Sequence, residues 1–260
     1  VLDPATADDH RMRQMHIRPF GNGELFNFSK DDTMYISRVM FFREKPDLTT
    51  HEAYMTGYND ATFKPNKTMT RAEACTVVAR LLDTEENIAK NTTTAFTDVA
   101  ADKWYTKYIS FCEAKGLLKS YSGTFAPEQN ITRAEFAELV YNMGLAKEDA
   151  ANKKTFTDVT EAHPKYAAIM AAASAGLIGG YEDGTFLPDR TITRAQVVTI
   201  LNRARGRDMT TDTLSNEFNV IFVDVDDSHW AFANIAEATV PHVAMDGKWV
   251  YAMLNPAEVL

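Results

Sequence analysis

Apolar positions follow a helical period in three separate stretches of the chain. In each stretch apolar residues recur at spacings of three and four, which is typical of a helix with one buried side. The apolar positions are Ala74, Val77, Val78 and Leu81 in the first stretch, Phe136, Leu139, Val140 and Met143 in the second, and Val197, Ile200, Leu201 and Ala204 in the third. Each stretch predicts an amphipathic helix that buries its apolar side against another part of the chain.

Each of these three stretches begins with nearly the same four residues. Thr-Arg-Ala-Glu occurs at 70–73 and at 132–135, and Thr-Arg-Ala-Gln occurs at 193–196. A threonine followed three residues later by Glu or Gln is a capping box, in which the two side chains and two backbone N–H groups satisfy each other. The repeated string therefore predicts where each helix begins, and it shows that the chain contains an internal repeat.

Two further strings also occur three times. A turn that ends in Phe-x-Pro occupies 57–65, 121–127 and 180–188, and Phe-x-Asp-Val (Val in place of Thr in the third copy) occupies 96–99, 156–159 and 222–225. The aspartates are expected just before a first helix of each repeat, where a carboxylate suits exposed N–H groups. The phenylalanines of the turns are expected to be buried anchors.

The order of these strings is shifted along the chain. The first copy has a turn and a second helix but no first helix before them, and the last copy has only the first helix. Three first and three second helices result, so we infer that the C-terminal helix near Trp230 docks beside the N-terminal turn and closes a ring, with Trp230 and Ile235 in contact with the unit that contains residues 70–82. The alternative is two complete units with a half-unit at each end, which would expose apolar surface at roughly 25 cal/mol per Å².

Composition narrows the function classes. The net charge is −9, which argues against nucleic acid as a partner. The apolar runs are shorter than the roughly 18 residues that a membrane span needs. Cys75 and Cys112 fall on apolar helix positions and are expected to be buried free thiols. Residues 1–4 lack the features of a signal peptide, so a cytosolic chain and a trimmed piece of a secreted chain both stay open.

Residues 1–50 lie outside the repeats. Segments 25–28 and 35–42 alternate loosely, as strands do. They are interpreted as a small β segment or as the tail of a preceding β-rich domain.

The sequence contains none of the common catalytic motifs. No His-Glu-x-x-His, Gly-x-Ser-x-Gly, phosphate loop or paired-cysteine metal spacing occurs. Asp224, Asp226 and Asp227 suggest calcium, but the other ligands of a calcium loop are missing, which favours an acidic cluster at a helix start. We therefore expect no catalytic residues, no cofactor and no metal.

Together the strings Phe-x-Asp-Val, Gly-Tyr-x-Asp-Gly-Thr-Phe-x-Pro and Thr-Arg-Ala-Glu, with Trp104 and Trp230 six residues after their aspartates, resemble the S-layer homology family of bacterial cell-envelope proteins. The resemblance implies a mainly α fold of three helix-loop-helix units around a pseudo-threefold axis. It assigns residues 51–245 to the repeat domain, with units 51–90, 96–147 and 156–207 and a closing helix at 222–243, and leaves 246–260 as a C-terminal tail.

The resemblance also implies a function. It predicts an extracellular, non-enzymatic module that anchors a bacterial surface protein to the cell wall by binding an anionic, pyruvylated secondary cell-wall polysaccharide in grooves between repeats. The alternatives are an S-layer lattice or cargo-protein interaction module without glycan binding, and an enzyme whose active site lies in residues 1–50 or elsewhere in a longer polypeptide. The chain departs from the family pattern at Pro164, which replaces a tryptophan, and at Gln196, Ala61 and His242.

The three arginines are the sharpest candidates for ligand contact. An arginine at the first helical position opposes the helix dipole by about 0.3–1 kcal/mol, so a carboxylate neighbour or an anionic ligand is expected to compensate. The two tryptophans fit a core position better than a sugar-stacking platform. Arg71 and Arg133 are ranked above Arg194, because Gln196 is expected beside Arg194. The candidate glycan-binding residues are Arg71, Arg133, Arg194, Trp104, Trp230, Tyr58, Tyr121, Tyr181, Asp98, Asp158 and Asp224.

Overall fold

The structure, a computed structural model, describes residues 48–207, 209–210, 222–245 and 248–252. The described residues belong to one compact unit, and the strands expected at 25–28 and 35–42 lie outside the described residues. The described part is mainly helical, as expected. Its elements are β1 Leu48–His51, α1 Arg71–Leu82, α2 Glu85–Ile88, α3 Thr106–Ala114, α4 Arg133–Asn142, the short 3-10 helix Ala150–Asn152, α5 Tyr166–Ser174, α6 Arg194–Ala204, α7 Phe232–Thr239, β2 His242–Met245 and β3 Lys248–Ala252.

The three second helices begin where the capping boxes predict. Helices α1, α4 and α6 start at Arg71, Arg133 and Arg194, and in each the preceding threonine accepts a hydrogen bond from the third helical N–H. The Glu or Gln at that third position accepts in return from the N–H of the threonine. The capping boxes are therefore confirmed, and Gln196 serves the box as well as a glutamate does.

The segments just before these helices join in a closed triangle of backbone hydrogen bonds. The Met69 N–H donates to Ile192 O (3.2 Å), the Ile192 N–H to Ile131 O (3.2 Å), and the Ile131 N–H to Met69 O (2.9 Å). All three side chains are buried. Since each residue donates to one neighbour and accepts from the other, the three repeats meet at a common centre.

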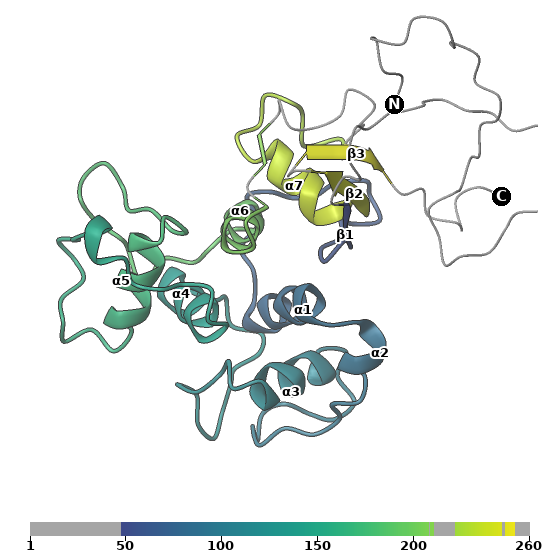
Figure 1. The fold of residues 1–260 in the computed structure, drawn as a ribbon. Coiled ribbons are helices and arrows are strands. Elements are labelled where there is room, and N and C mark those ends of the chain that lie inside the picture. Colours follow the sequence, from purple (N-terminus) through teal and green to yellow (C-terminus); the bar gives the residue numbers. More distant parts are fainter. Residues whose placement is uncertain (1–47, 208, 211–221, 246–247, 253–260) are drawn as a thin grey trace, which may run out of the picture. The chain divides into compact units, whose positions relative to one another are not determined.

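The first helices lie on the outer side of the second helices. Helix α3 packs on α1, α5 on α4, and α7 on α6, with α1, α4 and α6 innermost (Figure 1). Each first helix thus packs on the second helix that precedes it in the chain. Helix α7 thus packs mainly on α6, and it contacts the unit that contains residues 70–82 through the backbone of Tyr54 and Met55.

The ring itself is closed, as the shifted order predicts. The Val223 N–H donates to Ala61 O (2.9 Å), and Ala238 O accepts from the N–H groups of Tyr54 (3.1 Å) and Met55 (3.0 Å). These contacts join the beginning of the repeat region to its end. The alternative of two complete units with a half-unit at each end is wrong.

A small sheet reinforces the same junction. Strands β1, β2 and β3 form an antiparallel sheet in the order β1-β2-β3, with His51 opposite His242 in register. Strand β3 falls within residues 246–260, the segment that the sequence analysis left as a C-terminal tail.

The core agrees with the sequence pattern in its main anchors. Phe63, Phe125 and Phe186 of the three turns are buried, and Cys75 and Cys112 are buried free thiols.

Within the residues described, no helix is long and apolar enough to cross a membrane.

Candidate functional site: grooves between the repeats

The three repeated aspartates support the turns and do not cap the first helices. Asp98 accepts hydrogen bonds from the N–H groups of Phe125 (2.8 Å) and Ala126 (2.7 Å). Asp158 binds the two equivalent N–H groups of the third turn, and Asp224 binds those of the first turn. The expected helix-capping role is therefore wrong.

These carboxylates hold a strained backbone in place. The residue that follows each turn phenylalanine has a positive φ, namely 57° at Lys64, 53° at Ala126 and 56° at Leu187. A positive φ is unfavourable for residues other than glycine. Both oxygens of each aspartate are engaged by the turn, which indicates that Asp98, Asp158 and Asp224 shape the candidate sites.

Close packing explains why Gly-Tyr begins two of the turns. A Cβ at Gly57 would lie 2.2 Å from a ring carbon of Phe222, and a Cβ at Gly180 would lie 2.5 Å from a ring carbon of Phe156. The glycine therefore lets the Phe-x-Asp-Val segment lie directly against the turn. At Gly57 this packing joins residues from the two ends of the ring.

Each arginine reaches across a repeat boundary and binds the next turn. Arg133 donates from Nε to Phe186 O (2.9 Å) and from Nη2 to Gly179 O (2.7 Å). Arg194 does the same in the first turn, from Nε to Phe63 O (2.8 Å) and from Nη2 to Thr56 O (2.7 Å).

Both guanidinium groups also stack on a tyrosine. Arg133 lies 5.0 Å from the ring centre of Tyr181, and Arg194 lies 5.0 Å from that of Tyr58. Both arginines are buried, and no described carboxylate lies within ion-pair distance of either. Each of these arginines is thus brought together with one of the candidate tyrosines.

Arg71 has the same position but a different partner. It donates from Nη1 to Phe125 O (2.9 Å) and from Nη2 to the carboxylate of Glu135, with which it forms an ion pair. Its guanidinium lies 5.1 Å from the ring centre of Tyr121. We call Arg71, Tyr121 and Glu135 the Arg71 site.

The third residue of the following helix decides whether an arginine has this partner. Glu135 of α4 faces Arg71, whereas Gln196 of α6 lines a groove with Arg133. Gln196 therefore lines a groove with Arg133, whereas Glu73 is the third helical residue that lines a groove with Arg194. The sequence could not reveal this, because each arginine extends into the next repeat.

Two of the sites are hollowed into grooves beside an exposed tryptophan. Trp230 is 62% exposed and lines a groove of about 210 Å³, and Trp104 is 56% exposed and lines one of about 120 Å³. The expectation that these tryptophans belong to the core is wrong. The Arg133 groove is lined by Arg133, Tyr181, Gln196, Arg203 and Trp230, and the Arg194 groove by Thr56, Glu73, Arg80, Trp104 and Arg194, among others.

Comparison with known proteins identifies the repeats. The S-layer homology domain family matches residues 48–75, 95–137 and 155–198. These three repeats belong to the S-layer homology family. The match covers all three capping boxes, all three turns and the Phe-x-Asp-Val strings at 96–99 and 156–159.

The relatives of these S-layer homology repeats are larger proteins. The chain is 37% identical over 204 residues to Cell surface glycoprotein 1 of Acetivibrio thermocellus, which covers 74% of this chain and 8% of that protein. It is 35% identical over 197 residues to the Cellulosome-anchoring protein of the same organism, covering 74% and 43%. An Amylopullulanase of Thermoanaerobacterium thermosulfurigenes is 29% identical over 179 residues, covering 67% and 10%. The chain thus spans less than half the length of these relatives.

The arginines of these repeats differ in charge environment. Burial lowers the pKa of Arg133 and of Arg194. Burial also acts to lower the pKa of Arg71, but the hydrogen bond that Arg71 donates to Glu135 and the electrostatic attraction to Tyr121 and Glu135 together outweigh it, and that pKa is raised. An arginine remains protonated at neutral pH in proteins. Arg133 and Arg194 are therefore buried cations whose charge is met by carbonyl oxygens and aromatic rings.

At the Arg71 site a lysine stands beside the proline that replaces the family tryptophan. Lys165 Nζ binds Glu138 (2.5 Å) and Ser120 (3.0 Å) and lies 5.8 Å from the ring centre of Tyr121. The Arg71 site is thus filled by ion pairs within the protein. The Arg133 and Arg194 grooves have an exposed tryptophan in the place of these ion pairs.

Proposed function

We propose that this chain is a non-covalent anchor that binds an anionic secondary cell-wall polysaccharide, with the Arg133 groove as its principal site. The observation that carries the proposal is the buried guanidinium of Arg133, which lies in an open groove without a carboxylate partner among the described residues. S-layer homology repeats and relatives named for the cell surface and for anchoring place the chain at the surface of a bacterial cell.

The chemistry of the Arg133 groove suits a sugar that carries a carboxylate. A guanidinium can bind a carboxylate through two parallel hydrogen bonds. The exposed indole of Trp230 and the ring of Tyr181 offer flat apolar surfaces to the faces of a sugar ring. A pyruvyl ketal joins these two features in one residue, since it is a sugar with a carboxylate attached.

Charge must act locally in this chain. The net charge of −9 repels an anionic polymer at long range, where salt also screens the interaction. Within a groove the effective dielectric constant is lower, so a nearby cation interacts more strongly with its ligand. Binding is therefore assigned to the grooves and not to the surface as a whole.

The absence of enzymatic activity belongs to the same proposal. The Amylopullulanase shares only 10% of its length with this chain, so the resemblance to it covers a small part of that enzyme. An attachment module appended to proteins of different kinds accounts for a match to both an enzyme and a glycoprotein.

Sedimentation with purified cell-wall sacculi tests the proposal. The chain is expected to sediment with intact sacculi and to stay in solution with sacculi from which the secondary polymer has been extracted. Soluble polymer should compete, and polymer from which the pyruvyl groups have been removed should compete less well. Equal binding to extracted sacculi would instead support a lattice or protein-interaction module.

A further inference from the structure

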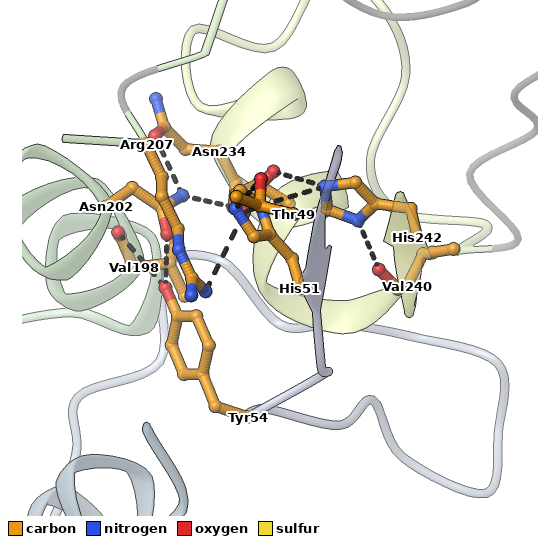
Figure 2. Close-up of polar contacts among 10 residues, drawn as sticks. Thr49, His51, Tyr54, Val198, Asn202, Arg207, Asn234, Val240 and His242 are labelled. Atoms are coloured by element: carbon orange, nitrogen blue, oxygen red, sulfur yellow. Dashed lines mark hydrogen bonds and ion pairs between the residues drawn. The ribbon is translucent and has the colours of Figure 1, made fainter. Parts of the chain in front are cut away.

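Two histidines and a glutamate converge beside the ring closure, and none of them lines either groove. His51 lies on β1, His242 on β2 and Glu237 on α7. His51 and His242 are opposite each other in the antiparallel register, which brings their rings to 4.9 Å between centres. Figure 2 shows the two labelled histidines meeting where dashed contacts converge.

The nitrogen and oxygen atoms of these side chains point at one another. His51 Nδ1 lies 2.7 Å from Glu237 Oε1, and His242 Nε2 lies 2.9 Å from Glu237 Oε2. The two histidine nitrogens are 3.2 Å apart. All the ligand atoms of the cluster lie within 4.8 Å of one another.

The backbone fixes the tautomer of His242. Its Nδ1 lies 2.8 Å from the carbonyl oxygen of Val240, which can only accept, so the proton must be on Nδ1 (Figure 2). In a neutral imidazole Nε2 then carries a lone pair, and this lone pair faces the carboxylate of Glu237. A lone pair and a carboxylate oxygen at 2.9 Å repel each other unless a cation lies between them.

Burial makes this requirement stronger. Glu237 and His242 are fully buried, and the side chain of His51 is 13% exposed. Arg207 Nη1 lies 4.0 Å from Glu237 Oε1, at the limit of an ion pair. The cation could be a second proton on His242 or a metal ion. The three side chains of the cluster, taken together, distinguish these two possibilities.

We propose that His51, Glu237 and His242 bind a divalent transition-metal ion, with zinc as the best match. Two imidazoles and a carboxylate are typical zinc ligands. Ligand atoms around a tetrahedral ion with bonds of about 2.0–2.1 Å lie about 3.3 Å apart, close to the 3.2 Å between the two histidine nitrogens. The bond from His242 Nδ1 to a backbone carbonyl is the outer contact that usually orients a metal-bound histidine.

Such an ion would cross-link the two ends of the repeat region and so stabilise the closed ring. His51 and His242 are separated by 191 residues in sequence and come from the two ends of the repeat region. Any proton on Nε2 of His242 or on Nδ1 of His51 leaves to solvent when the metal binds, because each ligand must offer a lone pair. The ion binds the folded chain and not the unfolded one, so it raises stability by mass action.

The test uses the full chain, freed of metal with a chelator and then titrated with zinc chloride. Calorimetry is expected to show one ion bound per chain, and the melting temperature is expected to rise with zinc concentration. Cobalt chloride is expected to give the strong visible absorption of a tetrahedral cobalt site. That spectrum is recorded on the unaltered chain, so it does not depend on whether a variant folds.

The variant His51→Ala removes the least buried ligand. It is expected to lower zinc affinity at least ~10-fold, since even outer contacts of a metal site typically change affinity ~10–100-fold. His163→Ala, at a half-buried histidine outside the cluster, is the matched control and is expected to bind zinc as the unaltered chain does. A melting temperature unaffected by zinc, no tetrahedral cobalt spectrum, or full zinc affinity in His51→Ala would each overturn the proposal. The cluster would then be a proton-mediated ion pair.

Discussion

The Arg133 groove and the Arg71 site are built from the same sequence strings, but they differ in charge and in access. Both arginines follow a capping threonine, donate to the carbonyl of a turn phenylalanine and stack on a tyrosine. At the Arg71 site the guanidinium pairs with Glu135, whereas in the Arg133 groove the equivalent position is Gln196. The same motif therefore gives a neutralised site in one place and a buried cation in the other.

The comparison shows that a repeat does not contain its own binding site. Arginine, turn and third helical residue come from neighbouring repeats, so one substitution alters the site of the repeat before it. The Arg194 groove is intermediate: Glu73 lines it but binds Lys67 (2.9 Å). We expect the affinities for an anionic glycan to follow the order Arg133 groove, Arg194 groove, Arg71 site.

Removing the arginines should separate the two sites most clearly. Arg133→Ala is expected to weaken binding of wall-polymer fragments by about 2–5 kcal/mol, because the ligand carboxylate loses its buried partner. Arg71→Ala, the matched control, is expected to change the binding free energy by less than ~1 kcal/mol. Calorimetric titration measures both, with circular dichroism to confirm folding. Equal losses in the two variants would contradict the proposed ranking.

Substitutions at the third helical residue, Gln196 of α6 or Glu135 of α4, should add or remove the carboxylate that faces the arginine. Gln196→Glu is expected to weaken binding by about 1.5–3 kcal/mol, the range of a hydrogen bond to a charged group, since the new carboxylate would pair with Arg133. Glutamate keeps the capping box, as Glu73 and Glu135 show, so the fold should be unaffected.

The reverse substitution, Glu135→Gln, provides the control for this exchange. It is expected to free Arg71 and to leave binding in the Arg133 groove unchanged or to add a weak second site. Tighter binding in Gln196→Glu would show that a carboxylate next to the arginine favours the ligand.

Trp230→Ala tests the aromatic surface of the Arg133 groove. It is expected to weaken glycan binding by about 0.5–1.5 kcal/mol, the range for a specific aromatic contact. Trp230 is exposed, so the melting temperature should stay nearly constant. Trp104→Ala, in the Arg194 groove, is expected to change glycan binding less, and a larger effect there would reverse the order of the two grooves.

Acidification should reveal the smallest difference, at the turn of the Arg71 site. Burial opposes ionisation of Asp98, but the hydrogen bonds from Phe125 and Ala126 outweigh it and lower its pKa. This carboxylate therefore stabilises the fold above its unfolded pKa of about 4, and the contribution is lost as the pH falls through the lower folded value. Denaturant unfolding of the parent and of Asp98→Asn should show a stability gap that narrows below pH ~4. A gap that widens on acidification would contradict this role.

The sequence predicts the fold well because its signals are local. A capping box and an apolar stripe specify each second helix within a dozen residues, and three copies imply a closed arrangement. The buried turn phenylalanines and free thiols follow from the same patterns. Strand β3 could not be predicted from the sequence, because its pairing depends on β2 and not on a strong local pattern.

The candidate sites were predicted less well because they depend on contacts between repeats. The sequence around Trp104 and Trp230 does not show whether their side chains face the core or the solvent. The packing of α3 and α7 leaves both side chains exposed. The role of Gln196 depends on how far Arg133 extends into the next turn. His51, Glu237 and His242 give no motif, since the cluster forms only when strands β1 and β2, from the two ends of the repeat region, pair.

The closed triangle of hydrogen bonds among Met69, Ile131 and Ile192 makes the arrangement of the repeats cyclic. Every corner donates and accepts once, so no corner is first or last. A fourth repeat could not be added without breaking a bond, in contrast to open solenoids that lengthen by one unit at a time. The chain could, however, begin and end at any of the three junctions between repeats and still fold into the same ring. The half-units at the two ends of this repeat region are one such circular permutation, in which Asp224 supports a turn encoded 160 residues earlier.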